Sequence, residues 1–109
     1  MNLSISNVII NYFLLHEDVK VIKNKDLIKL SNEIENKFNV KINFSKEDIK
    51  LTVDLCEDFL EVDENCNIKQ DGITKYLDTL EPVYQWFGVH DWDRTQEYYN
   101  FLKKYTFTA

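Results

Sequence analysis

Acidic side chains gather in one short stretch of the chain. Between Leu51 and Ile68 the sequence contains six acidic residues and no Lys or Arg. These six are Asp54, Glu57, Asp58, Glu61, Asp63 and Glu64. The whole chain has 19 acidic and 13 basic residues and a net charge of -6, so these six account for the entire imbalance. Carboxylates at this density could bind a cation, exchange protons with a substrate or attract a basic surface.

The spacing of the surrounding apolar residues predicts the element that holds these carboxylates. Ser45 and Asp48 have the spacing of a capping box, with Asp in place of Glu, and predict a helix from about Lys46 to Val62. Its apolar side consists of Ile49, Val53, Cys56 and Leu60. At about 100° per residue, the acids on the opposite side fall within an arc of roughly 100°. These acids are Asp54, Glu57, Asp58 and Glu61. Together with Asp63 and Glu64 in a polar loop over 63–72, they form a predicted carboxylate ridge.

Two interpretations of the carboxylate ridge are open. Runs of charge most often form a solvated face that keeps a protein soluble. The alternative is a docking surface for a basic partner, because clustered charge steers association and sets specificity more than it adds affinity. Carboxylates one helical turn apart, with no cation among them, repel one another by about a few tenths of a kcal/mol per pair. A sequence selected for helix stability alone would tend to place Lys among them.

Aromatic residues are concentrated in the last third of the chain. Most of them must pack in a core, but Tyr98 and Tyr99 are adjacent and cannot face the same direction on a helix. Trp92 lies between two aspartates at a predicted helix start. Tyr and Trp are frequent anchors of protein interfaces. We therefore expect Trp92 and one of the paired tyrosines, Tyr98, to contact a partner.

Metal sites and catalytic motifs find no support in the sequence. Cys56 and Cys66 are ten residues apart, which matches no paired zinc spacing. Asp93 and Glu97 lie one helical turn apart near His90, but capping and the helix dipole explain acids at a helix start. Glycine-rich phosphate loops and the G-x-S-x-G and H-E-x-x-H motifs are absent. We expect no metal, no cofactor and no enzymatic activity.

Apolar residues recur with helical spacing over most of the chain. The predicted helices cover about 5–18, 24–38, 46–62, 73–87 and, from 91 or 93, to 105. Pro82 interrupts the fourth helix and Gly88 ends it. Segment 39–44 alternates apolar and polar residues, as in an extended linker or a short edge strand, and we favour the linker because no convincing partner strand exists. The prediction is one all-α domain over 1–109, a compact bundle of about five helices.

The cellular setting is predicted from what the sequence lacks. No apolar run approaches the roughly 20 residues of a membrane span. The N-terminus lacks the basic leader and cleavage site of a signal peptide. Two cysteines without a disulfide pattern are typical of a reducing compartment. We therefore expect a cytoplasmic protein with no membrane partner, and no direct nucleic-acid partner because phosphate would repel the carboxylate ridge.

In size, acidic helical character and lack of a catalytic motif, the chain is similar to small bacterial immunity proteins that neutralise a cognate toxin, and to phage-encoded inhibitors of host defence enzymes. Nuclease toxins carry basic active surfaces, which a carboxylate ridge complements. The resemblance implies an inhibitor or immunity-type protein that binds and blocks a basic protein partner such as a toxin nuclease. Two alternatives stay open. One is a phage inhibitor that mimics nucleic acid, and the other is a homodimeric helical adaptor that dimerises through its aromatic C-terminal third.

Overall fold

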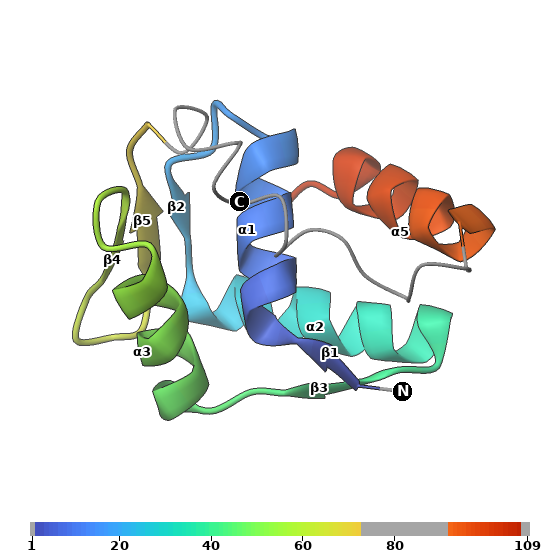
Figure 1. Ribbon diagram of the computed structural model, residues 1–109, viewed down its shortest axis with the longest axis horizontal. Coiled ribbons are helices and arrows are strands. Elements are labelled where there is room, and N and C mark those ends of the chain that lie inside the picture. Colours follow the sequence, from blue (N-terminus) through green and yellow to red (C-terminus); the bar gives the residue numbers. More distant parts are fainter. Residues whose placement is uncertain (1, 73–91, 108–109) are drawn as a thin grey trace.

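Helices and two small β-sheets build the structure together (Figure 1). The computed structural model describes residues 2–72 and 92–107. These described residues contain four helices, a two-stranded sheet and a three-stranded sheet, so the predicted all-α bundle of about five helices is wrong. The predicted helix over 73–87, with its interruption at Pro82 and its end at Gly88, lies outside the described residues. None of the helices in the described part has the length and apolar character needed to cross a membrane.

Helix α1 (Ile5–Leu15) stands at the centre of Figure 1, between the three-stranded sheet on the left and α5 on the right. Ser4 caps its N-terminus, with the Ser4 Oγ accepting the Asn7 N–H at 3.1 Å. Every residue from Asn7 to Phe13 is buried. Three other helices pack against α1, so protein surrounds it and these residues have no solvated face. The helical spacing predicted from Ile5 onward is confirmed, and the helix ends at Leu15 instead of near Asp18.

Helix α2 (Asn24–Phe38) has the predicted bounds. Its buried stripe consists of Leu27, Leu30, Ser31, Ile34 and Phe38. The residue after the helix, Asn39, caps its C-terminus in a left-handed conformation with φ 52°. Asn is one of the few residues that tolerate this conformation, and it commonly ends helices.

The strand that follows α2 in the sequence belongs to a parallel pair of short strands. Strand β3 (Lys41–Asn43) pairs with β1 (Asn2–Ser4), and Leu3 lies opposite Ile42. The linker favoured for 39–44 is therefore wrong, and the segment contains a strand. Leu3 and Ile42 are both buried, as the apolar alternation requires. The partner strand β1 has only three residues and lies at the N-terminal end of the sequence, separated from β3 by two helices, so only the tertiary structure reveals the pairing.

Helix α3 (Lys46–Leu55) begins where the capping box predicts. The Ser45 Oγ accepts the Asp48 N–H at 3.1 Å and donates to the Asp48 carboxylate at 2.7 Å. The helix ends at Leu55, whereas the prediction continued it to Val62. The helix predicted from Lys46 to Val62 is therefore too long, since its last residues form a turn and strand β4.

A tight turn ends α3 and leads into a strand. The Cys56 carbonyl accepts the N–H groups of both Phe59 and Leu60, at 3.0 and 2.8 Å. This turn buries Phe59 and Leu60 together with Cys56. Strand β4 (Leu60–Val62) begins directly after it.

The three-stranded sheet has the order β2–β5–β4 and is antiparallel throughout. Strand β5 (Ile68–Gln70) lies in the middle, between β2 (Val21–Ile22) and β4. The polar loop predicted over 63–72 thus contains a strand. The inward side chains Ile22 and Ile68 are completely buried, so pairing the strands also extends the core.

Helix α5 (Trp92–Lys104) matches the predicted last helix and packs on α1. Three side-chain hydrogen bonds connect the C-terminal segment, made of α5 and Tyr105, with α1 and with His16, the residue that follows α1. They are Tyr98 Oη to Asn7 Oδ1 at 2.9 Å, Tyr12 Oη to the Tyr105 carbonyl at 2.9 Å, and His16 Nε2 with the Leu102 carbonyl at 2.7 Å. These bonds link residues that lie far apart in the sequence.

Candidate binding surface

A row of three side chains crosses the exposed face of the three-stranded sheet. Lys69 on β5 lies between Val21 on β2 and Glu61 on β4 in the strand register. All three residues are exposed, whereas Ile22 and Ile68 on the same strands are buried. The alternation of side chains along a strand therefore points Lys69 outward, beside an oppositely charged cross-strand neighbour.

The chain around this row forms a hollow of about 390 Å³, which we call the sheet hollow. Its charged lining comprises four carboxylates and two ammonium groups. These groups belong to Glu57, Asp58, Glu61, Asp71, Lys20 and Lys69. Such a hollow can accept basic side chains from another protein, while its own cations restrict where those side chains lie.

Backbone and side-chain hydrogen bonds hold the walls of the sheet hollow in place. Gln70 is buried, and its Nε2 donates to the Val19 carbonyl at 2.8 Å. Its backbone N–H donates to the Lys20 carbonyl at 2.9 Å. The next residue, Asp71, donates its N–H to the Phe59 carbonyl at 2.9 Å. The sheet thus brings together segments on both sides of α2 and α3.

The fold divides the predicted carboxylate ridge. Glu57 and Asp58 in the turn, and Glu61 on β4, line the sheet hollow together. Asp54 is exposed on α3 and Glu64 is exposed in the loop between β4 and β5, and neither lines the hollow. The helical arc that would have joined Asp54 to Glu61 does not form, because α3 ends before the turn.

Asp63 has a structural environment of its own. Its Oδ1 accepts the N–H groups of Asn65 and Asn67 at 2.9 Å each, and its Oδ2 accepts the Asn67 Nδ2 at 3.1 Å. The hydrogen bond from the Asn67 backbone is the main cause that lowers the pKa of Asp63, and Lys69 adds a smaller effect. Asn67 in turn accepts the Asn24 N–H at the start of α2 at 3.0 Å. The Asp63 carboxylate therefore orders the loop and ties it to α2.

The two predicted aromatic anchors have different outcomes. Tyr98 is completely buried, and its hydroxyl donates to Asn7, so it does not reach the surface. Burial is also the main cause that raises the pKa of Tyr98. Trp92 is the first residue of α5, and its side chain lies outside the described part of the structure. The adjacent Tyr99 is partly buried against the core.

Sequence reasoning missed three charged residues of the sheet hollow, namely Lys20, Lys69 and Asp71. Residues 68–71 contain one apolar residue, Ile68, so no alternation of apolar and polar residues marks this segment as a strand with Lys69 and Asp71 on one face. The structure shows that face because Gln70 is buried although its side chain is polar. No local signal connects Lys20 to this group.

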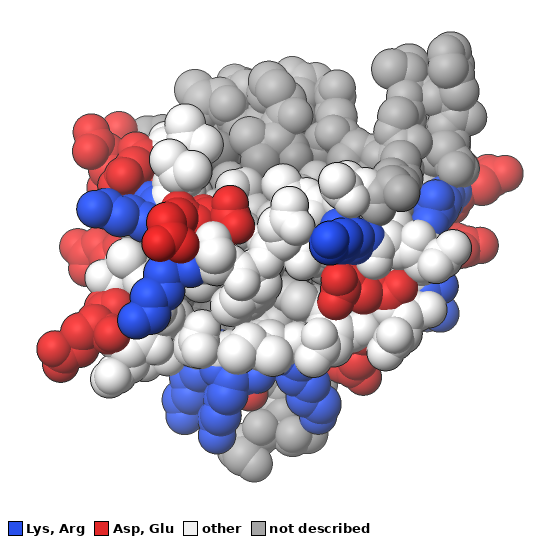
Figure 2. Space-filling model, turned by 90° about the horizontal axis from the view of Figure 1, so that it is seen from below, with Lys and Arg blue, Asp and Glu red and all other residues white. Residues whose placement is uncertain are grey.

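Figure 2 shows carboxylates and ammonium groups side by side at the left end of the face seen from below, where α3 lies in Figure 1, and an uncharged area across its middle.

A second hollow, of about 510 Å³, lies between α2 and α5. Lys37 and Lys104 line it together with Glu97, and the Lys37 Nζ lies 5.8 Å from the centre of the Phe101 ring. Cations therefore outnumber anions in this second hollow, whereas anions outnumber cations in the sheet hollow. None of the carboxylate ridge contributes to it.

The cysteines are free thiols with unlike surroundings. Cys56 is buried, and burial raises the pKa of its thiol, which disfavours the reactive thiolate. Cys66 is partly exposed in the loop after β4 and adopts a left-handed conformation with φ 61°. Among residues 2–72 and 92–107, no three His, Cys, Asp or Glu side chains are grouped so that they could hold a metal ion.

Comparison of the chain with protein families, with curated proteins and with solved structures found no match. The residues of the sheet hollow, their exposure and their charges are therefore the basis of the functional proposal.

Proposed function

We propose that this protein is a small acidic inhibitor of the immunity type, which binds and blocks a basic protein partner such as a toxin nuclease. The observation that carries the proposal is the gathering of four exposed carboxylates around the sheet hollow. Three of them, Glu57, Asp58 and Glu61, belong to the acidic stretch of the sequence, and Asp71 joins them through the fold.

The chemistry of the sheet hollow suits lysine or arginine side chains. Carboxylates accept charge-assisted hydrogen bonds, and a guanidinium can bind one of them through two parallel bonds. Lys20 and Lys69 lie in the same hollow and would repel a cation placed beside them. The partner's basic residues must therefore match the positions of the carboxylates, which favours specificity as well as attraction.

The same two lysines make a protein partner a better match than mimicry of nucleic acid. A nucleic-acid backbone presents regularly spaced anions with no fixed cations between them. In the sheet hollow, Lys69 lies directly beside Glu61 in the strand register. The homodimeric adaptor is less well supported too, since its interface was expected among C-terminal aromatics and Tyr98 is in the core.

If the protein is an immunity protein, the gene next to its own should encode the toxin. The test therefore uses the product of that adjacent gene as the partner. Its association rate with this protein is measured by surface plasmon resonance across a range of salt concentrations. Glu57→Gln combined with Glu61→Gln should lower the association rate roughly three- to tenfold at low salt and flatten its salt dependence. The matched control is Asp93→Asn combined with Glu97→Gln, which removes two exposed carboxylates from α5 and should leave the rate nearly unchanged.

Equal association rates for the two double variants would contradict the role of the sheet hollow. Failure of the adjacent gene product to bind, or an adjacent gene for a metabolic enzyme, would contradict the immunity function itself. Circular dichroism of each variant shows whether its fold is retained.

A further inference from the structure

Two leucines on α3 face solvent. Leu51 is 60% exposed and Leu55 77%, more than the other exposed large apolar residues of the described chain, Ile28 at 42% and Val21 at 41%. Because they are four residues apart on one helix, their side chains lie on the same face one turn apart. We call this pair the leucine strip. Leucines at such exposure lose contact with water when a partner covers them.

The orientation of α3 is fixed by its opposite side. Ile49 and Thr52 are its buried residues, and the Thr52 hydroxyl lies 2.6 Å from the Ser6 hydroxyl on α1. Leu51 is about 160° around the helix from Ile49. The leucine strip therefore cannot turn inward unless α3 detaches from α1.

The charges next to the leucine strip are negative. Glu47 and Asp54 flank it on one side, about 40–100° around the helix from the leucines, and Asp48 flanks it on the other. Lys46 and Lys50 lie beyond the first pair of acids, at least about 100° from Leu51. No Lys or Arg occupies the last turn of α3, although the C-terminal end of a helix favours a cation.

We propose that the leucine strip is the apolar anchor for an amphipathic basic helix of the protein partner. The partner's apolar residues would cover Leu51 and Leu55, and its Lys or Arg side chains would bind the flanking acids and the C-terminal end of α3. An apolar centre with a charged rim is the usual anatomy of a protein interface, and apolar residues at i and i+4 of a helix match the spacing of the strip. This inference rests on the proposed function and adds a second contact to it, since Asp54 and Leu55 lead directly into the turn that carries Glu57 and Asp58.

The experiment uses the full chain and two synthetic peptides as probes. The first is a helix with leucines at i and i+4 and lysines along the rest, and the second has serine in place of the leucines. Binding is followed by ¹H–¹⁵N NMR titration, which reports both the Kd and the amides that shift. The test variant is Leu51→Ser combined with Leu55→Ser, and the matched control is Ile28→Ser, an exposed apolar residue on α2.

The expected result is that the leucine–lysine peptide shifts the α3 amides, and that the double variant raises its Kd at least about tenfold while Ile28→Ser leaves it unchanged. The serine peptide should bind more weakly and equally to both proteins. Because both substituted leucines are exposed, the double variant should keep its fold, which its NMR spectrum shows directly.

Three outcomes would overturn the inference. One is no binding of the leucine–lysine peptide, and another is binding that the double variant leaves unchanged. The third is sedimentation that reveals a dimer of this protein which the double variant converts to monomer, because a second copy would then cover the strip. None of these decides the proposed function, which depends on Glu57 and Glu61 with the natural partner.

Discussion

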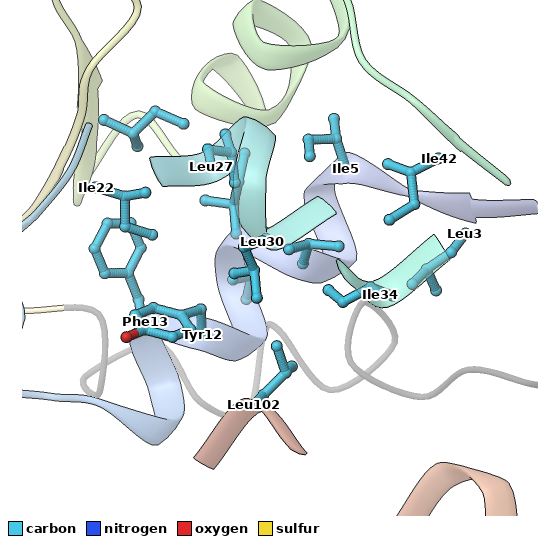
Figure 3. Packing of buried hydrophobic residues seen from close by; sticks show 14 of the residues in the cluster. Leu3, Ile5, Tyr12, Phe13, Ile22, Leu27, Leu30, Ile34, Ile42 and Leu102 are labelled. Atoms are coloured by element: carbon cyan, nitrogen blue, oxygen red, sulfur yellow. The ribbon is translucent and has the colours of Figure 1, made fainter. Parts of the chain in front are cut away.

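The surroundings of α1 and the outer face of α3 use the same kinds of side chain in opposite ways. Around α1, apolar side chains from separate elements point toward one another, and Figure 3 shows Phe13, Leu30 and Leu102 among them. On α3, Leu51 and Leu55 point to solvent beside carboxylates. The difference indicates that stability resides mainly in the buried faces around α1, whereas the exposed faces of α3 and of the three-stranded sheet contribute little to it. Substitutions in the buried faces should therefore change stability more than substitutions on the exposed faces.

The largest contrast should come from two helical leucines at opposite extremes of burial. Leu30 is completely buried, and Leu30→Ala should lower the free energy of unfolding by about 2–5 kcal/mol, through lost burial and the cavity left behind. Leu55→Ala should change it by less than about 0.5 kcal/mol. Urea unfolding followed by circular dichroism measures both. Similar losses for the two variants would show that α3 carries as much of the stability as the core.

A smaller loss is expected from the buried polar contacts between α1 and α5. Asn7 Oδ1 accepts hydrogen bonds from Tyr98 Oη and from Asn11 Nδ2, both at 2.9 Å. Asn7→Ala removes this acceptor and should lower the free energy of unfolding by about 1–3 kcal/mol. Asn32→Ala, at an exposed position on α2, is the control and should stay within about 0.5 kcal/mol of the wild type. If both variants unfold at the same urea concentration, the contact contributes nothing to stability.

The smallest effect should come from Asp63, and it should depend on pH. Its pKa in the folded protein lies below the ordinary 3.8, so ionisation of Asp63 favours the folded state. This stabilisation is complete above pH 3.8 and is lost as the pH falls through the lower pKa of the folded state. Asp63→Ala should therefore unfold more easily than the wild type at neutral pH, with the difference shrinking in acid. Urea unfolding at neutral and acidic pH checks this, and a difference that grows in acid would refute it.

Much of the helical structure follows from the sequence. Apolar spacing predicts α1, α2 and α5, and the capping box at Ser45 predicts the first residue of α3. These signals are reliable because helical spacing and capping depend on residues within one or two turns of each other. The same local rules failed at Cys56, where the carbonyl turns the chain although the apolar spacing continues to Leu60.

The candidate site was predictable only in part. The density of acids pointed to Glu57, Asp58 and Glu61 as a group, and they do lie together at the sheet hollow. The geometry that joined them to Asp54 was wrong, because it assumed one continuous helix. Lys20 could not be predicted at all, since it reaches the hollow through pairing between strands that α2 and α3 separate in the sequence.

The sequence by itself determined where the described helices start, which residues of α2 are apolar, and that the negative charge is concentrated in one stretch. Those properties depend on neighbours along the chain. Only the tertiary structure decided that 41–43 is a strand paired with 2–4, that α3 stops at Leu55, and that cations lie among the acids of the sheet hollow. The physical reason is that strand pairing satisfies backbone hydrogen bonds between distant segments, and the burial gained by that pairing outweighs the local preference for helix.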